Sequence, residues 1–218
     1  MILMVFDVET NGYAGSSVVQ FSAVKYKYIN NKIEKMDSIN TYYIPVEDFN
    51  MKAFETHRLS LEFLKEKVRE RWSELKEVYR EELKDEEFKN LLQSSIKYFK
   101  NDIVIEEFIS DVDIFIGHNI ERFDMKFLKE HIESCGLKEY YIFDTMIQNT
   151  PHMKMPPPED KKVRYKYKSP KLQETAEFYG IEVDESKIHD ARYDVTITVK
   201  ILKEMMKIDK FKKILLDM

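Results

Sequence analysis

Cysteine is almost absent from this sequence, and its scarcity removes two classes of structure. The single residue, Cys135, cannot form a disulfide within the chain, and a lone cysteine does not provide the ligand set of a zinc site. No apolar run is long enough to span a bilayer, because the run from Ile2 to Phe6 is short, has no basic leader and ends in acidic residues. We therefore expect a cytoplasmic protein with no membrane association.

An excess of positive charge is also lacking. The chain has 35 Lys and Arg against 40 Asp and Glu, a formal net charge of -5, which argues against a protein that coats duplex nucleic acid through a broad basic face. This net charge is still compatible with a local basic groove. No repeat of solenoid length and no low-complexity tract is present, so the 218 residues fit one globular domain, with or without an insertion.

The N-terminal part of the chain has the pattern of β-strands. The run from Ile2 to Phe6 is apolar without alternation, as in a strand that is covered on both faces. The segments Val18 to Tyr28 and Lys32 to Ile44 are rich in β-branched and aromatic residues and meet at Asn30-Asn31, a turn signal. These two segments are predicted to form an antiparallel hairpin.

Helical periodicity then takes over. From Ser60 to Phe99 apolar residues recur every three or four positions, with a break near Lys84-Asp85, and this segment either covers the sheet or binds a partner. Later strands and helices alternate, with strands predicted at 113–116 and 140–143 and helices at 122–134, 171–179 and 191–206. This order predicts an α/β domain with a mixed central β-sheet flanked by helices.

Acidic residues follow the first strand. Asp7 and Glu9 are two positions apart, so their side chains point to the same face of a strand and repel each other unless cations lie nearby. By itself the pair favours the alternative, in which one acid caps the turn at Thr10 to Gly12 and the other is exposed to solvent.

Two further segments carry acids at helix starts. Asp124 follows Gly117-His118-Asn119 and lies in the first turn of a helix, where an aspartate is also common for structural reasons alone. Asp194 adjoins the apolar side of the last helix, an unusual place for an unpaired carboxylate, and His189 precedes that helix on a segment that suits a proton carrier.

Taken together, these segments resemble the DEDDh superfamily of 3′→5′ exonucleases, the DnaQ-like group that includes the proofreading epsilon subunit of DNA polymerase III. The matching motifs are Phe6-Asp7-Val8-Glu9-Thr10, then His118-Asn119 through Phe123-Asp124, then His189-x-Ala191-x-x-Asp194, in the family's order. Asp144-Thr145 and Leu172 through Ile181 extend the resemblance over almost the whole chain. It implies an RNase H-like exonuclease fold. Asp190 stands where a sister branch has tyrosine, which indicates the histidine branch.

The resemblance implies a metal site and a set of roles. Asp7, Glu9, Asp124 and Asp194 would hold two Mg²⁺ or Mn²⁺ ions, hard cations that prefer oxygen ligands, and His189 would take the proton from the attacking water. Thr10, Asn119 and Phe123 would border the pocket for the terminal nucleotide, although Phe123 also fits a purely packing role. His57-Arg58-Leu59 resembles the family's His-Gly-Ile segment near that pocket, and Arg58 departs from it.

A basic segment suggests how single strands are held. Between Pro151 and Pro170, a predicted loop or hairpin, lysines and Arg164 alternate with Val163, Tyr165 and Tyr167, so an extended chain would place cations and rings on opposite faces. Lys166 and Lys168 are therefore predicted to bind substrate. The alternative is a surface hairpin whose tyrosines pack on the domain.

The sequence thus predicts one DEDDh exonuclease domain over 1–218, with a charged helical insertion at about 60–100 and a basic loop at about 151–170. Its substrate would be nucleic acid with a free 3′ end, single-stranded or frayed DNA first and RNA second. A DNA polymerase or a replication or repair protein is a possible partner, and a non-catalytic nucleic-acid-binding module is the alternative of another class.

Overall fold

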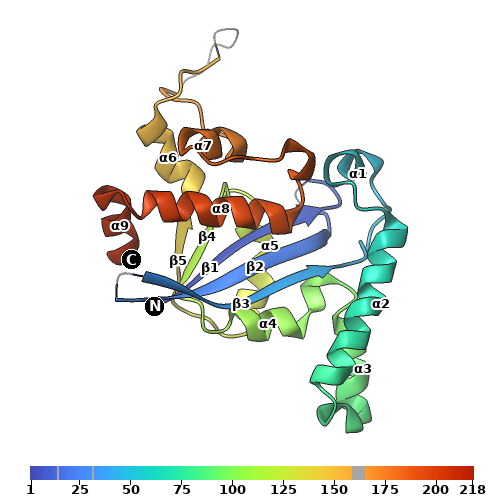
Figure 1. The fold of residues 1–218 in the computed structure, drawn as a ribbon. Coiled ribbons are helices and arrows are strands. Elements are labelled where there is room, and N and C mark those ends of the chain that lie inside the picture. Colours follow the sequence, from blue (N-terminus) through green and yellow to red (C-terminus); the bar gives the residue numbers. More distant parts are fainter. Residues whose placement is uncertain (14, 31, 159–164) are drawn as a thin grey trace.

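A five-stranded sheet forms the centre of the protein, in a computed structural model that describes residues 1–13, 15–30, 32–158 and 165–218. The strands are β1 (Ile2–Thr10), β2 (Val18–Ile29), β3 (Lys32–Tyr42), β4 (Ile114–Gly117) and β5 (Tyr141–Asp144), in the order β3-β2-β1-β4-β5 (Figure 1). The first three are antiparallel neighbours, and β4 and β5 run parallel to β1. The predicted mixed sheet and its hairpin are confirmed.

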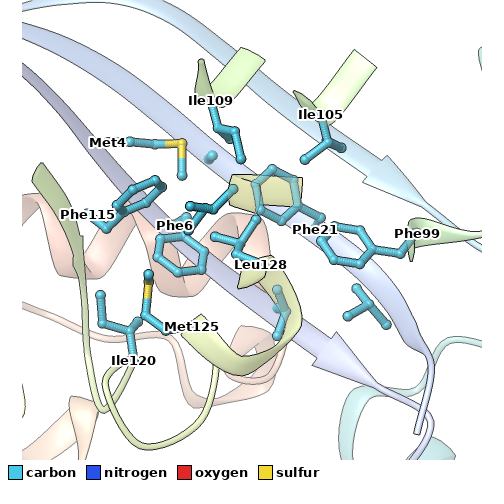
Figure 2. Close-up of a cluster of buried hydrophobic side chains, with 14 of the residues drawn as sticks. Met4, Phe6, Phe21, Phe99, Ile105, Ile109, Phe115, Ile120, Met125 and Leu128 are labelled. Atoms are coloured by element: carbon cyan, nitrogen blue, oxygen red, sulfur yellow. The ribbon is translucent and has the colours of Figure 1, made fainter. Parts of the chain in front are cut away.

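Alternate residues of β1 pack against different helices. Met4, Phe6 and Val8 face a core shared with α4 (Ile103–Ile109) and α5 (Met125–Ser134), in which the aromatic rings of β1, β2 and β4 meet (Figure 2). Leu3 and Val5 face a second core on the opposite side. Its helices are α7 (Leu172–Phe178), α8 (Ala191–Met205) and α9 (Asp209–Leu216), with α8 lying across β1 and β2 (Figure 1). Because side chains alternate along a strand, Asp7 and Glu9 continue the series that faces α8.

The helical segment after the hairpin divides close to the predicted break. Helix α2 (Leu61–Val78) begins at Ser60, whose side chain accepts a hydrogen bond from Phe63 N, and α3 (Glu86–Ser95) begins at Asp85. A short 3₁₀ turn, η1 (Glu82–Lys84), joins them. The two helices extend away from the sheet (Figure 1) and bury a small core of their own that includes Leu75, Leu92 and Ile96.

Several short helices go beyond the prediction. Helices α1 (Met51–His57), α4 and α6 (Thr145–Met153) were not expected, and α6 includes Pro151, so the predicted loop begins only after Met153. Two further 3₁₀ turns are η2 (Phe99–Asn101) and η3 (Glu185–Lys187). The C-terminal residues form a separate helix, α9, after α8. Of the turn at Asn30-Asn31, Asn31 lies outside the described residues.

A buried ionic network anchors α2 to the domain. The Asp102 carboxylate, fully buried at the start of α4, accepts hydrogen bonds from the Arg71 guanidinium of α2 and, at 2.7 Å, from the Tyr43 hydroxyl. Burial, and then the charge of Asp102, raise the pKa of Tyr43, so this hydroxyl stays a donor. Removing either the Arg71 guanidinium or the Tyr43 hydroxyl leaves the buried Asp102 carboxylate without one of its partners, which lowers the stability of the fold.

We expect Arg71→Ala to lower the free energy of unfolding by about 3–5 kcal/mol, because it strands the Asp102 charge. Arg80→Ala, which removes an exposed arginine at the end of α2, is the matched control and should change stability by less than about 0.5 kcal/mol. Urea denaturation of both variants measures the difference. Equal effects of the two substitutions would show that the network does not anchor α2.

Candidate active site

The first two acids lie where β1 extends beyond its parallel neighbour. Pairing of β1 with β4 stops at Val5 and Ile116, so the β1 backbone is open at Val8. The Asp124 carboxylate closes this opening by accepting a hydrogen bond from Val8 N at 3.1 Å. Asp124 is therefore held beside Asp7 and Glu9 by the strand itself. Asp124 directly precedes α5, and its side chain makes no helix-capping hydrogen bond.

The loop that carries Asp124 is shaped by Gly117 and Asp144. A Cβ at Gly117 would lie 2.1 Å from Ile120 Cγ2 and 2.9 Å from Phe6 O, so only glycine allows this loop to pack against β1. The buried Asp144 carboxylate accepts hydrogen bonds from Asn119 N at 3.0 Å and Glu121 N at 3.1 Å, and it also caps α6. The loop backbone is thus fixed from both sides.

The fourth acid, Asp194, is carried by α8. The helix begins at Asp190, whose side chain accepts a hydrogen bond from Tyr193 N, and the buried Gln20 of β2 accepts one from Ala191 N at 3.2 Å. These contacts set the first turn of α8 over the sheet, where Asp194 is 7% exposed. Asp194 Oδ2 accepts a hydrogen bond from His189 N at 3.3 Å, while the buried Asp194 Oδ1 has no partner among the described residues.

Electrostatic repulsion is concentrated at this point. Burial and then the charge of Asp124 raise the pKa of Asp7 well above its usual value, and burial and then Asp194 do the same for Glu9. Burial raises the pKa of Asp124 and of Asp194 to about 7. These shifts mean that four carboxylates from three segments are close enough to oppose one another's ionisation.

The donor set fits a divalent cation. Ligand atoms of Glu9, His189 and Asp194 all lie within 4.8 Å of one another. This trio includes His189, whereas the sequence predicts Asp7 and Asp124 as the remaining ligands. A bound cation would remove the repulsion among the acids and give the unpartnered Asp194 Oδ1 a ligand to bind. Both observations favour a cation over an empty carboxylate cluster.

A cleft of about 540 Å³ opens over the acids. It brings together most of the predicted site: Asp7, Glu9, Asn119, Phe123, Asp124, His189 and Asp194 all line it. The segment from Ser169 to Gln173 also lines the cleft. The His118 imidazole contacts this segment at Pro170 O and contacts Thr145 Oγ1, each at 3.0 Å. The Phe123 ring also packs on Phe127, 5.4 Å between centroids, so its packing and wall positions coexist.

Other predicted substrate residues lie outside this cleft. Thr10 is nearly buried at the end of β1, with its hydroxyl donating to Gly12 O at 2.6 Å, and it does not line the cleft. His57 lines a neighbouring pocket, on the far side of His189. Neither side chain lines the cleft that holds the acids.

The basic segment differs from its prediction. Residues 161–164 lie outside the described residues, and Tyr165 to Lys168 do not form a strand. The Lys166 ammonium lies 5.2 Å from the centre of the Tyr167 ring, so cation and ring share a side rather than occupying opposite faces. The Lys168 ammonium binds the Glu174 carboxylate at the start of α7. Lys168 is therefore engaged in a structural ion pair, whereas Lys166 is exposed.

Three positions that shape the site received no role from the sequence. Asp144 organises the Asn119 loop, Gly117 permits its close approach, and Gln20 receives the start of α8. For Asp144 a signal existed, since an aspartate directly after a strand and before a helix is a typical N-cap. Gln20 carries no local signal, because its partner lies 171 residues away.

Comparison with known proteins agrees with this geometry. A protein-family model described as exonuclease (RNase_T) matches residues 97–202, just under half of the chain. The matched segment includes Asp124, His189 and Asp194, and it does not reach Asp7 and Glu9. No curated protein sequence matches the chain significantly.

Solved exonucleases share the fold. Exonuclease X in complex with 5′ overhanging duplex DNA is 16% identical, with 95% of this chain and 93% of that chain covered and a TM-score of 0.53. Escherichia coli exonuclease I in complex with a dT13 oligonucleotide is 14% identical, with a TM-score of 0.62 over 99% of this chain and 42% of that one. This chain thus spans less than half of exonuclease I.

Over residues 97–202 the chain is similar to the exonuclease (RNase_T) family, and as a whole it shares the RNase H-like fold of the solved exonucleases. This similarity agrees with the resemblance to DnaQ-like 3′→5′ exonucleases that the sequence motifs carry. Within the described residues, no helix has the length and apolar character needed to cross a membrane.

The raised carboxylate pKa values predict how metal and pH affect stability. Because the pKa of Asp124 and Asp194 is about 7 in the folded protein against a usual 3.8, the folded state retains protons that the unfolded chain has already lost. The metal-free protein should therefore lose stability as the pH rises between these two values. Mg²⁺ or Mn²⁺ replaces those protons, so it should raise the unfolding temperature more at about pH 8 than at about pH 5. Scanning fluorimetry with and without EDTA measures this, and a shift independent of pH would contradict it.

Removing one acid should relieve the repulsion. We expect Asp194→Asn to raise the unfolding temperature of the metal-free protein at about pH 8 by roughly 2–4 °C, the effect of about 1 kcal/mol in a chain of this size. The same variant should lose most of its stabilisation by metal. Asp217→Asn, at an exposed position after α9, is the control and should do neither. A destabilised Asp194→Asn would argue that the charge is compensated without metal.

Proposed function

We propose that this chain is a divalent-metal-dependent 3′→5′ exonuclease that releases 5′-mononucleotides from single-stranded or frayed DNA. The observation that carries the proposal is the convergence of Asp7, Glu9, Asp124 and Asp194 at the floor of one cleft, with the buried Asp194 Oδ1 left unpartnered among the described residues. Four uncompensated carboxylates destabilise a fold, so their retention at one place is best explained by a cationic ligand.

In this proposal Asp7, Glu9, Asp124 and Asp194 hold two Mg²⁺ or Mn²⁺ ions. When bound, such ions supply neutralisation of the phosphate charge and a lowered pKa for water. The protein's contribution is rigidity, because Val8 N orients the Asp124 carboxylate and His189 N orients that of Asp194. Carboxylates held in fixed orientations would bind the ions in one geometry, and such preorganisation of reacting groups contributes to the rate.

His189 is proposed as the proton acceptor. Partial burial, followed by the charges of Lys171 and Arg58, lowers the pKa of His189, so the imidazole is neutral at neutral pH and able to accept a proton from water. Its ring is exposed at the cleft, and its backbone has φ 67°, a left-handed conformation fixed by the hydrogen bond to Asp194. This places the base beside the carboxylates without making it part of a helix.

Selection of a strand end is assigned to the cleft walls. A volume of about 540 Å³ is in the size range of small-ligand pockets and suits one nucleotide. Phe123 offers a ring face to a base, and Asn119 has φ 70°, which turns the loop toward the cleft. His57 and Thr10 are proposed to contribute from the edges, and Lys166 to contact the strand farther away. In this role a base of the strand stacks on the Phe123 ring, and such stacking does not depend on the base sequence.

DNA is proposed ahead of RNA because the structures that share the fold include exonuclease X with duplex DNA and exonuclease I with dT13. Other parts of the proposal rest on sequence alone. These are a cytoplasmic location, a polymerase or replication or repair partner, and a single domain over 1–218 in which α2 and α3 are an insertion.

We expect Asp7→Ala and Asp194→Ala each to abolish metal-dependent hydrolysis, because each removes a ligand and leaves the remaining acids misplaced. His189→Ala should lower the rate by about 10²–10⁴-fold, the usual contribution of a general base, while leaving metal-induced stabilisation in place. Asp217→Ala is the control for charge loss. Rates are measured on an end-labelled single strand with Mg²⁺. Full activity in either aspartate variant would sink the assignment.

A second experiment tests direction and substrate. Labelled single-stranded DNA and RNA, each with a free or a blocked 3′ end, are incubated with Mg²⁺, Mn²⁺ or EDTA. The proposal expects stepwise shortening from a free 3′ end of DNA only when metal is present. Faster shortening of RNA than of DNA would change the proposed substrate to RNA and leave the proposed reaction unchanged. Binding without any shortening would favour a non-catalytic nucleic-acid-binding module.

A further inference from the structure

A second pocket, of about 480 Å³, adjoins the cleft and shares Ile188 and His189 as a common wall. It is formed by the end of α1, the η3 turn and the first turn of α8. None of the four acids of the cleft lines it, and its lining includes three basic side chains in addition to two histidines: Arg58, Lys187 and Arg192. The charge of this pocket is thus opposite to that of the cleft.

Arg58 occupies a backbone conformation that disfavours it. It ends α1 with φ 61°, in the left-handed region where glycine has no steric penalty and a long side chain does. Within the described residues its guanidinium makes one hydrogen bond, a long one of 3.5 Å to Ser186 O. The fold therefore gains little from an arginine at this position, which suggests that the side chain serves a ligand.

His57 presents an unused donor to the same pocket. Its Nδ1 accepts a hydrogen bond from Leu59 N at 3.0 Å, so the proton of the neutral ring is on Nε2. Burial and then the charge of His189 lower the pKa of His57 to about 4, which keeps the ring neutral. The ring is 5% exposed, and Nε2 has no partner among the described residues. A buried N–H without an acceptor is costly unless a ligand supplies one.

Arg192 completes a set of donors. It is exposed on the first turn of α8, and its guanidinium has no ion pair or hydrogen bond within the described part of the chain. The other charges nearby are engaged, since Lys187 binds Asp184 at 2.8 Å and Asp190 caps α8. Among the described residues, the pocket is thus lined by the Arg192 guanidinium, which has no partner, the Arg58 guanidinium, which has one long hydrogen bond, and the His57 N–H donor, while the carboxylate of Asp190 already has a partner.

We propose that Arg58, Arg192 and the Nε2–H of His57 form a phosphate subsite, which binds a backbone phosphate of the strand whose terminal nucleotide occupies the cleft. Guanidinium groups match the geometry of phosphate oxygens, and phosphate needs donors only, which is what the pocket offers. The inference rests on the proposed nuclease function for its substrate. It goes beyond that function by adding Arg58 and Arg192, which the catalytic cleft does not include.

Binding without hydrolysis tests the subsite. Fluorescence anisotropy of a labelled single-stranded oligonucleotide is measured in EDTA, and again with Ca²⁺, for wild type, Arg58→Gly and Arg192→Ala. Each variant should bind the oligonucleotide about tenfold more weakly than wild type. This loss corresponds to the low end of the range for the free energy of a hydrogen bond to a charged group. The slope of log affinity against log salt should become shallower by about 0.7 for each phosphate that the variant no longer neutralises. Arg69→Ala and Arg80→Ala, which remove exposed charges on and after α2, are the matched controls.

Stability separates a binding role from a structural one. Because Arg58 has a positive φ, Arg58→Gly should keep or raise the unfolding temperature while it weakens binding. Arg58→Lys keeps the charge and should restore part of the affinity. Lower stability with unchanged affinity, or variants that bind as the controls do, would overturn the subsite, as would a wild type that binds no oligonucleotide with Ca²⁺.

Two sources of phosphate are distinguished by competition. If the subsite holds a backbone phosphate, a dinucleotide or longer strand should compete better than a mononucleotide, and inorganic phosphate should compete poorly. Equal competition by inorganic phosphate would overturn the assignment to the strand. If the wild type hydrolyses the strand and the variants bind it as tightly as the wild type does, the subsite alone is rejected. If the variants bind the strand more weakly but the wild type does not hydrolyse it, the nuclease function alone is rejected.

Discussion

Repulsion among four carboxylates is the constraint on which this structure depends. Asp7, Glu9, Asp124 and Asp194 come from three separate segments, and each has its pKa raised by burial or by the others. Ionised carboxylates at this spacing repel one another, so the three segments that carry them separate unless the rest of the fold holds them together. The two apolar cores, one on each face of the sheet, supply that restraint, because β1 is fixed between them at every residue from Leu3 to Phe6.

The restraint is completed by polar contacts that each have a long sequence separation. Val8 N holds Asp124, Asp144 holds the backbone of the Asn119 loop, and Gln20 holds the first turn of α8. All three connect an element of the sheet to a segment that carries an acid. The geometry of the site is therefore a property of the whole fold, because contacts with distant segments hold the acids together against their mutual repulsion.

The sequence predicted the parts of this arrangement that have a local signal. The apolar run of β1, the hairpin of β2 and β3 and the long periodic segment of α2 and α3 all appear near their predicted bounds, and the cleft gathers the predicted acids. Short helices were missed because seven to nine residues carry little periodicity, although Asn50, Asp102 and Asp144 are N-caps that mark their starts. The ion pair of Lys168 with Glu174 and the left-handed φ of Arg58 depend on tertiary contacts, for which the residue types alone carry no signal.

Charge distribution connects the acids to the binding of a substrate. The chain is negative overall, and its cleft floor repels phosphate, so a strand approaches the proposed site only if positive charge compensates locally. Part of that charge is built in, since Lys171 and Arg122 line the cleft and Arg58 and Arg192 line the adjacent pocket. Divalent ions bound by the acids, as proposed, would supply the rest of the positive charge. In that case the ion would favour entry of the strand as well as its cleavage, because it removes the repulsion between the acids and the phosphates.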